Sequence, residues 1–147
     1  MLFYRIEHQE TRTGPYCHDA MNEVVHVVHK HNEAEGGVYA LDPRDHKGPI
    51  EDGGELEAFW KSTNKFTEIH RREGYRFGFV SREDAHWWWV GSTIPEVVKI
   101  LENHGFVLNV YEVPEAFTGN TQAIAKLDGL TPIETIKPRE MLTWDIG

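Results

Sequence analysis

The sequence predicts an α+β fold, a single domain over residues 1–147 in which helices flank a mixed or antiparallel sheet. Three observations support this prediction. The length of 147 residues and the hydrophobic content of 39% are typical of one globular domain that buries its own core. Helix-type and strand-type hydrophobic periodicities both occur along the chain. Helical segments dominate the middle of the chain and the last third is a run of strand-like segments, an order typical of a mixed α+β domain.

The first half predicts one strand, one long helix and a long loop. Residues 2–7 (LFYRIE) alternate as a half-buried strand does, and residues 13–16 (TGPY) form a turn. Residues 18–32 place alanine, methionine and four valines on one side of a helix. Residues 36–54 are rich in Gly, Pro and Asp and are expected to form a surface loop.

The second half begins with helical segments at residues 55–61 and 65–72, followed by a strand at residues 75–80. Ser81 and Asp84 have the spacing of a capping box, so we expect a helix to start directly after this strand. Thr93 and Glu96 repeat that spacing, with Pro95 in the first turn of the next helix.

The helix predicted after Thr93 stops at Gly105, which suits a left-handed C-terminal residue. Residues 106–113 (FVLNVYEV) give the clearest strand signal and end at a proline. A further strand is expected at residues 121–127, and residues 133–136 are its expected pairing partner.

The charge balance excludes some classes of partner. The 24 acidic and 15 basic residues give a formal net charge of −9, which opposes binding to nucleic acid or to an anionic membrane. No segment approaches the roughly 20 apolar residues of a membrane span, and we expect no signal peptide. The single cysteine, Cys17, suits the reducing cytoplasm.

Three consecutive tryptophans, Trp87, Trp88 and Trp89, follow Ser81 in the predicted helix. On a helix they spread over about 200°. One or two of them can therefore enter the core, and at least one is expected to line a groove or the surface. They could serve as packing, or as a stacking wall for a flat ring.

The nine histidines and the long loop raise the question of metal or acid–base chemistry. His18, His26 and His29 lie on one side of the first predicted helix, where they could bind a metal ion or simply face solvent. The loop carries His46 among carboxylates and could bind a cation, do acid–base chemistry or be a solvated turn. Neither pattern matches a known metal motif, and we expect no metal.

The layout of the chain resembles small proteins carried by bacteriophages. The resemblance rests on the opening YRIE, then GPY, a central FGF-x-S and the late GF-x-L-x-VYEV. It implies expression in the cytoplasm of an infected bacterium and a role against host defence.

The order of polar and aromatic residues is also similar to the compact ADP-ribosyltransferase fold. In that family an arginine on the first strand holds a phosphate of NAD, which matches Tyr4-Arg5. A later strand delivers a Ser or Thr into a helix, which matches Phe79-Val80-Ser81 followed by Trp87. A late strand presents Glu or Gln at the ribose, which matches Gln122.

The resemblance implies NAD, or a nucleotide derived from it, as the ligand. Arg5 would hold phosphate, Ser81 would organise the pocket, and Tyr16 or Trp87 would stack on a base. The usual catalytic residue is Glu, and a glutamine lacks the carboxylate that stabilises an oxocarbenium-like transition state. Gln122 therefore implies binding without transfer, or a different catalytic residue such as Glu112.

Each of these residues also has a purely structural interpretation. Arg5 could pair with Glu7 of a neighbouring strand, Ser81 could be only a helix cap, and Gln122 could be an ordinary strand residue. Tyr4 and Tyr16 could belong to the core.

Three functions therefore stay open. The first is an ADP-ribosyltransferase-like protein that binds NAD, with or without modifying a host protein. The second is a non-enzymatic acidic inhibitor that binds a host protein as a mimic of nucleic acid. The third is a metal-dependent hydrolase that uses His18, His26 and His29.

Overall fold

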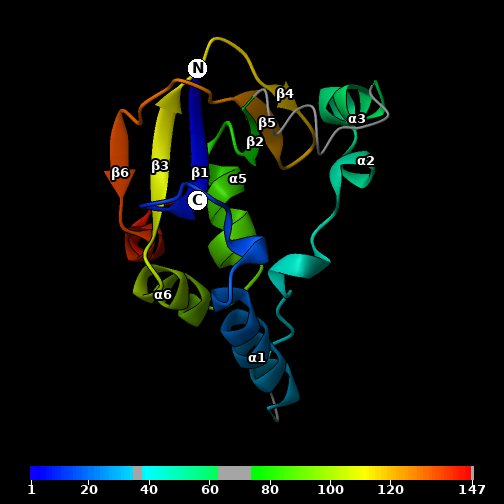
Figure 1. Ribbon diagram of the computed structural model, residues 1–147. Coiled ribbons are helices and arrows are strands. Elements are labelled where there is room, and N and C mark those ends of the chain that lie inside the picture. The colour runs from blue at the N-terminus through cyan, green and yellow to red at the C-terminus, as the bar shows by residue number, and fades with distance from the viewer. Residues whose placement is uncertain (35–37, 63–73, 147) are drawn as a thin grey trace. The chain divides into compact units, whose positions relative to one another are not determined.

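The computed structural model describes residues 1–34, 38–62 and 74–146 (Figure 1). It confirms an α+β architecture, with several helices and two small antiparallel sheets. The strand order is β1-β3-β6 in one sheet and β2-β5-β4 in the other. The predicted helix at residues 65–72 lies outside the described residues.

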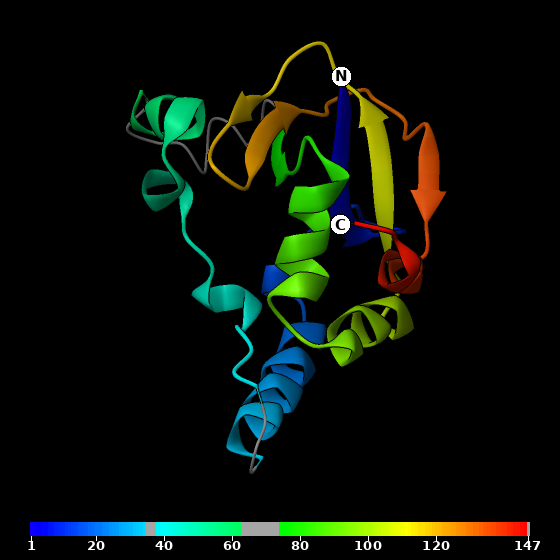
Figure 2. The same cartoon turned by 180° about the vertical axis from the view of Figure 1, so that it is seen from behind.

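The first sheet contains the strands that the sequence predicts best. They are β1 (Leu2–His8), β3 (Phe106–Glu112) and β6 (Glu134–Ile136), with β3 in the centre (Figures 1 and 2). Both long strands are rich in β-branched and aromatic residues, which favour a pleated, buried surface.

The second sheet contains β2 (Tyr75–Gly78), β4 (Phe117–Thr118) and β5 (Ala123–Lys126). Strand β5 lies between the other two and pairs antiparallel with both, for example Gly78 with Ala123. The expected pairing of residues 133–136 with this strand is therefore wrong. Both edges of β5 are already occupied, and the amide of Ile133 donates to the carbonyl of Val110 instead.

The helices are α1 (Ala20–Glu33), α2 (Pro49–Asp52), α3 (Gly54–Lys61), α5 (Arg82–His86) and α6 (Pro95–Asn103). Single 3₁₀ segments occur at Pro15–Cys17, Pro43–Asp45 and Pro138–Thr143. The expected surface loop at residues 36–54 thus contains a 3₁₀ turn and a short α-helix. It also contributes buried carboxylates, since Asp42 is 3% exposed and Asp52 is 1% exposed.

The helix signals are confirmed in part. The amide of Asp84 donates to Ser81 Oγ (3.1 Å), as the first capping box predicts. The second capping box is wrong, because Ile94 is the N-cap and Thr93 donates its hydroxyl proton to the carbonyl of Trp89 (2.7 Å). Gly105 follows α6 with φ of +87°, the conformation that its expected role as a stop requires.

The chain divides into two compact units. Unit 1 comprises Met1–Arg5, Lys47–Ala85 and Asn109–Glu134; unit 2 comprises Ile6–His46, His86–Leu108 and Thr135–Gly147. In unit 1, Phe3 and Tyr111 pack with the small residues of β5. In unit 2, α6 packs against α1 and the 3₁₀ segment Pro138–Thr143, burying Val24, Val28, Val97, Leu101 and Met141.

Candidate functional site

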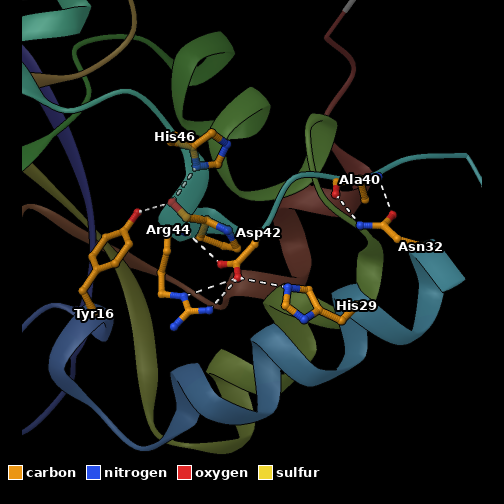
Figure 3. A network of polar contacts seen from close by, with 8 residues as sticks. Tyr16, His29, Asn32, Ala40, Asp42, Arg44 and His46 are labelled. Carbon is orange, nitrogen blue, oxygen red and sulfur yellow. Dashed lines mark hydrogen bonds and ion pairs between the residues drawn. The ribbon is translucent and has the colours of Figure 1, made fainter.

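A network of polar contacts in unit 2 surrounds Asp42 (Figure 3). Asp42 precedes Pro43, whose fixed φ starts the 3₁₀ turn Pro43–Asp45, and its Oδ1 accepts from the amide of Arg44 (2.9 Å). Its Oδ2 accepts from Nε (3.3 Å) and Nη2 (3.0 Å) of Arg44, and His29 Nε2 lies 3.7 Å away. A buried carboxylate is thereby supplied with charged and neutral donors.

Arg44 is the surface member of this network. Its side chain is 54% exposed although its guanidinium is bonded through Nε and Nη2 to a nearly buried carboxylate. These bonds restrict the orientation of a side chain that would otherwise sample many rotamers. The arrangement therefore holds a charged, planar donor group at the surface in one orientation.

Aromatic side chains continue the network from the carbonyl of Pro43. That oxygen accepts from the hydroxyl of Tyr16 (3.4 Å) and lies 3.1 Å from His46 Nδ1. The indole N–H of Trp88 donates to the Tyr16 hydroxyl (2.8 Å). Burial of this hydroxyl raises the pKa of Tyr16, so that it stays protonated, while the residue as a whole is 44% exposed.

His46 packs on the tryptophans and contacts a serine. Its ring lies 4.1 Å from that of Trp88 and 5.2 Å from that of Trp87, centroid to centroid. Its Nε2 is 2.8 Å from Ser92 Oγ, which is also 3.1 Å from the carbonyl of Trp88. Burial is the main cause of a lowered pKa for His46, which favours the neutral ring.

The His46–Ser92 pair has the separation of a base and a nucleophile, but its surroundings disfavour nucleophilic chemistry. Ser92 caps the C-terminal end of a helix, where the carbonyl oxygens carry partial negative charge. Such a position opposes a developing oxyanion, which needs N–H donors or a helix N-terminus. We interpret the pair as a hydrogen bond that fixes the His46 ring.

The three tryptophans occupy the helix as the sequence predicts. Trp88 and Trp89 are 5% and 3% exposed, whereas Trp87 is 44% exposed. The segment Trp87–Gly91 is a π-helical turn, in which the amide of Ser92 donates to the carbonyl of Trp87 (2.8 Å). This wider turn accommodates two adjacent indoles in the core and leaves the third ring at the surface beside His46.

The residues predicted from the ADP-ribosyltransferase resemblance are divided between the units. Tyr16 and Trp87 belong to unit 2, and the others, Tyr4, Arg5, Ser81, Glu112 and Gln122, belong to unit 1. In unit 1, Tyr4 pairs with Phe79, two positions before Ser81, and Gln122 precedes Ala123, the partner of Gly78. Arg5 therefore lies on strand β1, whereas Ser81 follows the segment that pairs with β1 and Gln122 directly precedes β5.

The polar groups among them interact within the protein. Arg5 is 8% exposed and donates from Nη1 to the carbonyl of Phe77 (2.8 Å). Gln122 is 8% exposed and donates from Nε2 to the carbonyl of Lys47 (3.0 Å). Glu112 is exposed and accepts from the amino group of Met1 (2.6 Å). Tyr4 is buried, and burial raises the pKa of its hydroxyl.

The described residues offer no set of metal ligands for the metal-hydrolase hypothesis. Among residues 1–34, 38–62 and 74–146, no three His, Cys, Asp or Glu side chains are grouped so that they could hold a metal ion. His18 Nδ1 instead accepts from the amide of Ala20 (3.0 Å), and His29 lies beside Asp42. Within the same ranges, no helix has the length and apolar character needed to cross a membrane.

Sequence reasoning missed part of this network. The Asp42-Pro43 pair could have been recognised from the sequence. An aspartate before proline often accepts a hydrogen bond from the amide two residues later and so caps a turn. The contact between His46 and Ser92 had no such signal, since the two residues are 46 positions apart.

Comparison with known proteins supports the bacteriophage resemblance and gives no support to the ADP-ribosyltransferase one. No curated protein and no solved structure matches the chain significantly. One protein-family model matches residues 1–139, and its description is Bacteriophage T4 Y00F protein. Because the match covers nearly the whole sequence, the chain belongs to the Bacteriophage T4 Y00F protein family.

Proposed function

We propose that this phage protein binds a nucleotide, of the NAD or NAD-derived class, in the cytoplasm of the infected bacterium. The observation that carries the proposal is the fixed, exposed guanidinium of Arg44 on the turn whose Pro43 carbonyl binds Tyr16 and His46. A guanidinium held in this way offers a preorganised fork to a phosphate. The exposed rings of Tyr16 and Trp87 offer stacking surfaces to a base.

This proposal moves the phosphate contact from Arg5 to Arg44. Arg5 is nearly buried and donates to a main-chain carbonyl, whereas the side chain of Arg44 is half exposed. Tyr16 and Trp87 belong to the same unit as Arg44. The local cation also answers the objection of net charge, because one fixed guanidinium can attract phosphate on a protein whose total charge is −9.

Binding without ADP-ribosyl transfer is the form of the proposal that the geometry favours. The side-chain amide of Gln122 donates to a main-chain carbonyl, and Glu112 pairs with the terminal amine. Neither residue belongs to unit 2, where the proposed stacking rings lie.

Calorimetric titration with NAD, ADP-ribose and AMP tests the proposal. We expect Arg44→Gln to weaken binding by about tenfold or more, the effect of losing a charged hydrogen bond to phosphate. Arg139→Gln is the matched control in unit 2, because Arg139 is 49% exposed and also pairs with a carboxylate, Glu102 (2.7 Å). Arg5→Lys distinguishes the two candidate phosphate contacts.

The absence of binding at millimolar ligand would contradict the proposal. Equal losses of affinity in the Arg44 and Arg139 variants would show that binding depends on the total charge of the protein and not on a contact with Arg44. A loss confined to Arg5→Lys, with unchanged thermal stability, would return the site to unit 1 and to the ADP-ribosyltransferase-like arrangement.

A second candidate, an acidic inhibitor that binds a basic host protein, has support from the charge of −9 and from the exposed ring of Trp87. A charge-driven complex of this kind weakens as salt screens it. Pull-down from host lysate at low and high salt distinguishes it, since a complex insensitive to salt is not of this type.

A further inference from the structure

The segment Val38–Leu41 has one side held by helix α1. The carbonyl of Val38 lies 2.6 Å from His31 Nε2. The side-chain amide of Asn32 binds both main-chain groups of Ala40, donating to its carbonyl (2.8 Å) and accepting from its amide (2.7 Å) (Figure 3). The contact with Asn32 therefore resembles one rung of a β-ladder, made by a side chain instead of a strand.

This pattern fixes the direction of the neighbouring main-chain groups. In extended backbone, the N–H and C=O of one residue point to the same side, and successive residues alternate. The groups of Ala40 point towards α1, and the amide of Leu41 donates to the carbonyl of Ser92 (2.7 Å) instead. The N–H and C=O of Tyr39 are thus directed away from α1.

The main-chain N–H and C=O of Tyr39 contrast with those of Ala40. Among the residues that the structure describes, neither the N–H nor the C=O of Tyr39 has a hydrogen-bond partner. Tyr39 is 72% exposed and Val38 is 80% exposed, the largest values among the exposed large hydrophobic residues described. Valine and tyrosine both favour strands. Two exposed, strand-forming residues therefore lie next to main-chain groups that are available for strand pairing.

We propose that Val38–Leu41 is a docking edge to which a partner protein adds an extended strand. Strand addition supplies an acceptor and a donor to Tyr39 and covers the two exposed side chains. The partner strand is expected to be apolar with basic rather than acidic flanks, because the chain carries a net charge of −9. This inference is independent of nucleotide binding.

Two substitutions separate the main-chain contribution from that of the side chain. Tyr39→Pro removes the unpaired N–H together with the ring and leaves the Asn32–Ala40 contacts in place, since proline is compatible with an extended edge. Tyr39→Val removes the ring but keeps the N–H and the strand propensity. Thermal unfolding of both variants checks that unit 2 is intact.

The test is capture from lysate of the host bacterium on immobilised wild-type, Tyr39→Pro and Tyr39→Val proteins, followed by hydrogen exchange on the captured complex. We expect the partner to be lost about tenfold with proline and retained with valine, and the Tyr39 amide to be protected in the complex. Equal capture by the proline variant, an unprotected Tyr39 amide or no captured protein would overturn the proposal. Sedimentation of the isolated protein tests whether the docking edge binds a second copy of this chain instead. Self-association that protects the Tyr39 amide would overturn the proposal of a partner protein.

Discussion

Trp88 and Trp89 are buried to nearly the same extent, yet their indole N–H groups differ. The N–H of Trp88 donates to Tyr16, whereas the N–H of Trp89 has no partner in the described part of the chain. A buried donor without an acceptor costs about 1–3 kcal/mol. Replacing it with an apolar ring therefore removes a penalty as well as some packing.

We expect Trp89→Phe to destabilise the protein less than Trp88→Phe, by about 1–2 kcal/mol. Both substitutions remove the same volume, so the difference reports the hydrogen bond lost at Trp88 together with the penalty relieved at Trp89. Chemical denaturation of the two variants measures the free energy of unfolding. An equal or larger loss in Trp89→Phe would show that its indole has an acceptor, for example an ordered water.

At the scale of elements, Asp52 joins helix α2 to the turn before β5. Its carboxylate accepts from the amides of Thr121 and Gln122 (3.0 Å each to Oδ2), and its carbonyl accepts from the amide of Asn120 (2.9 Å). A Cβ at Gly119 would collide with this carboxylate, which explains a glycine at that position. Asp52 thus connects helix α2 to this turn through its own hydrogen bonds to main-chain amides.

We expect Asp52→Ala to lower the free energy of unfolding by roughly 2–4 kcal/mol, because it leaves two main-chain donors without their acceptor. Glu51→Ala is the control, since Glu51 lies on the same short helix and is exposed. Urea denaturation compares the two variants. A loss shared equally by both would attribute the effect to helix propensity or charge and not to the turn.

The elements predicted from the sequence are those whose signals are local. Strands β1 and β3 and helix α6 follow from periodicity within a few residues, and Gly105 from its position after α6. The partner of β6 did not follow, because strand pairing depends on which edges are already occupied.

The candidate site shows the same limit. The exposure of one tryptophan of three followed from helical geometry, whereas the contacts of Arg44 depend on the burial of Asp42 by distant segments. The burial of Arg5 and Gln122 likewise results from packing in unit 1, which no short pattern encodes.

At the scale of the whole molecule, His46 links folding to pH. Burial lowers its pKa in the folded protein, and the carbonyl of Pro43 and the carboxylate of Asp42 offset this only in part. The unfolded chain, with an ordinary histidine pKa of about 6.5, therefore binds more protons than the folded one as the pH falls below that value. The contribution of His46 to stability is present above this pKa and is lost as the pH falls.

We expect the free energy of unfolding to decrease between pH 7.5 and pH 5.5, and to decrease less in His46→Gln, which cannot bind the proton. Urea denaturation at several pH values measures both slopes, and the other histidines cancel in the comparison. The range stops at pH 5.5 because Asp84 acts in the opposite direction at lower pH, since burial raises the pKa of its carboxyl. Identical slopes in the two proteins would mean that the His46 ring is hydrated in the native state, and that the aromatic surface formed with Trp87 and Trp88 opens readily to water.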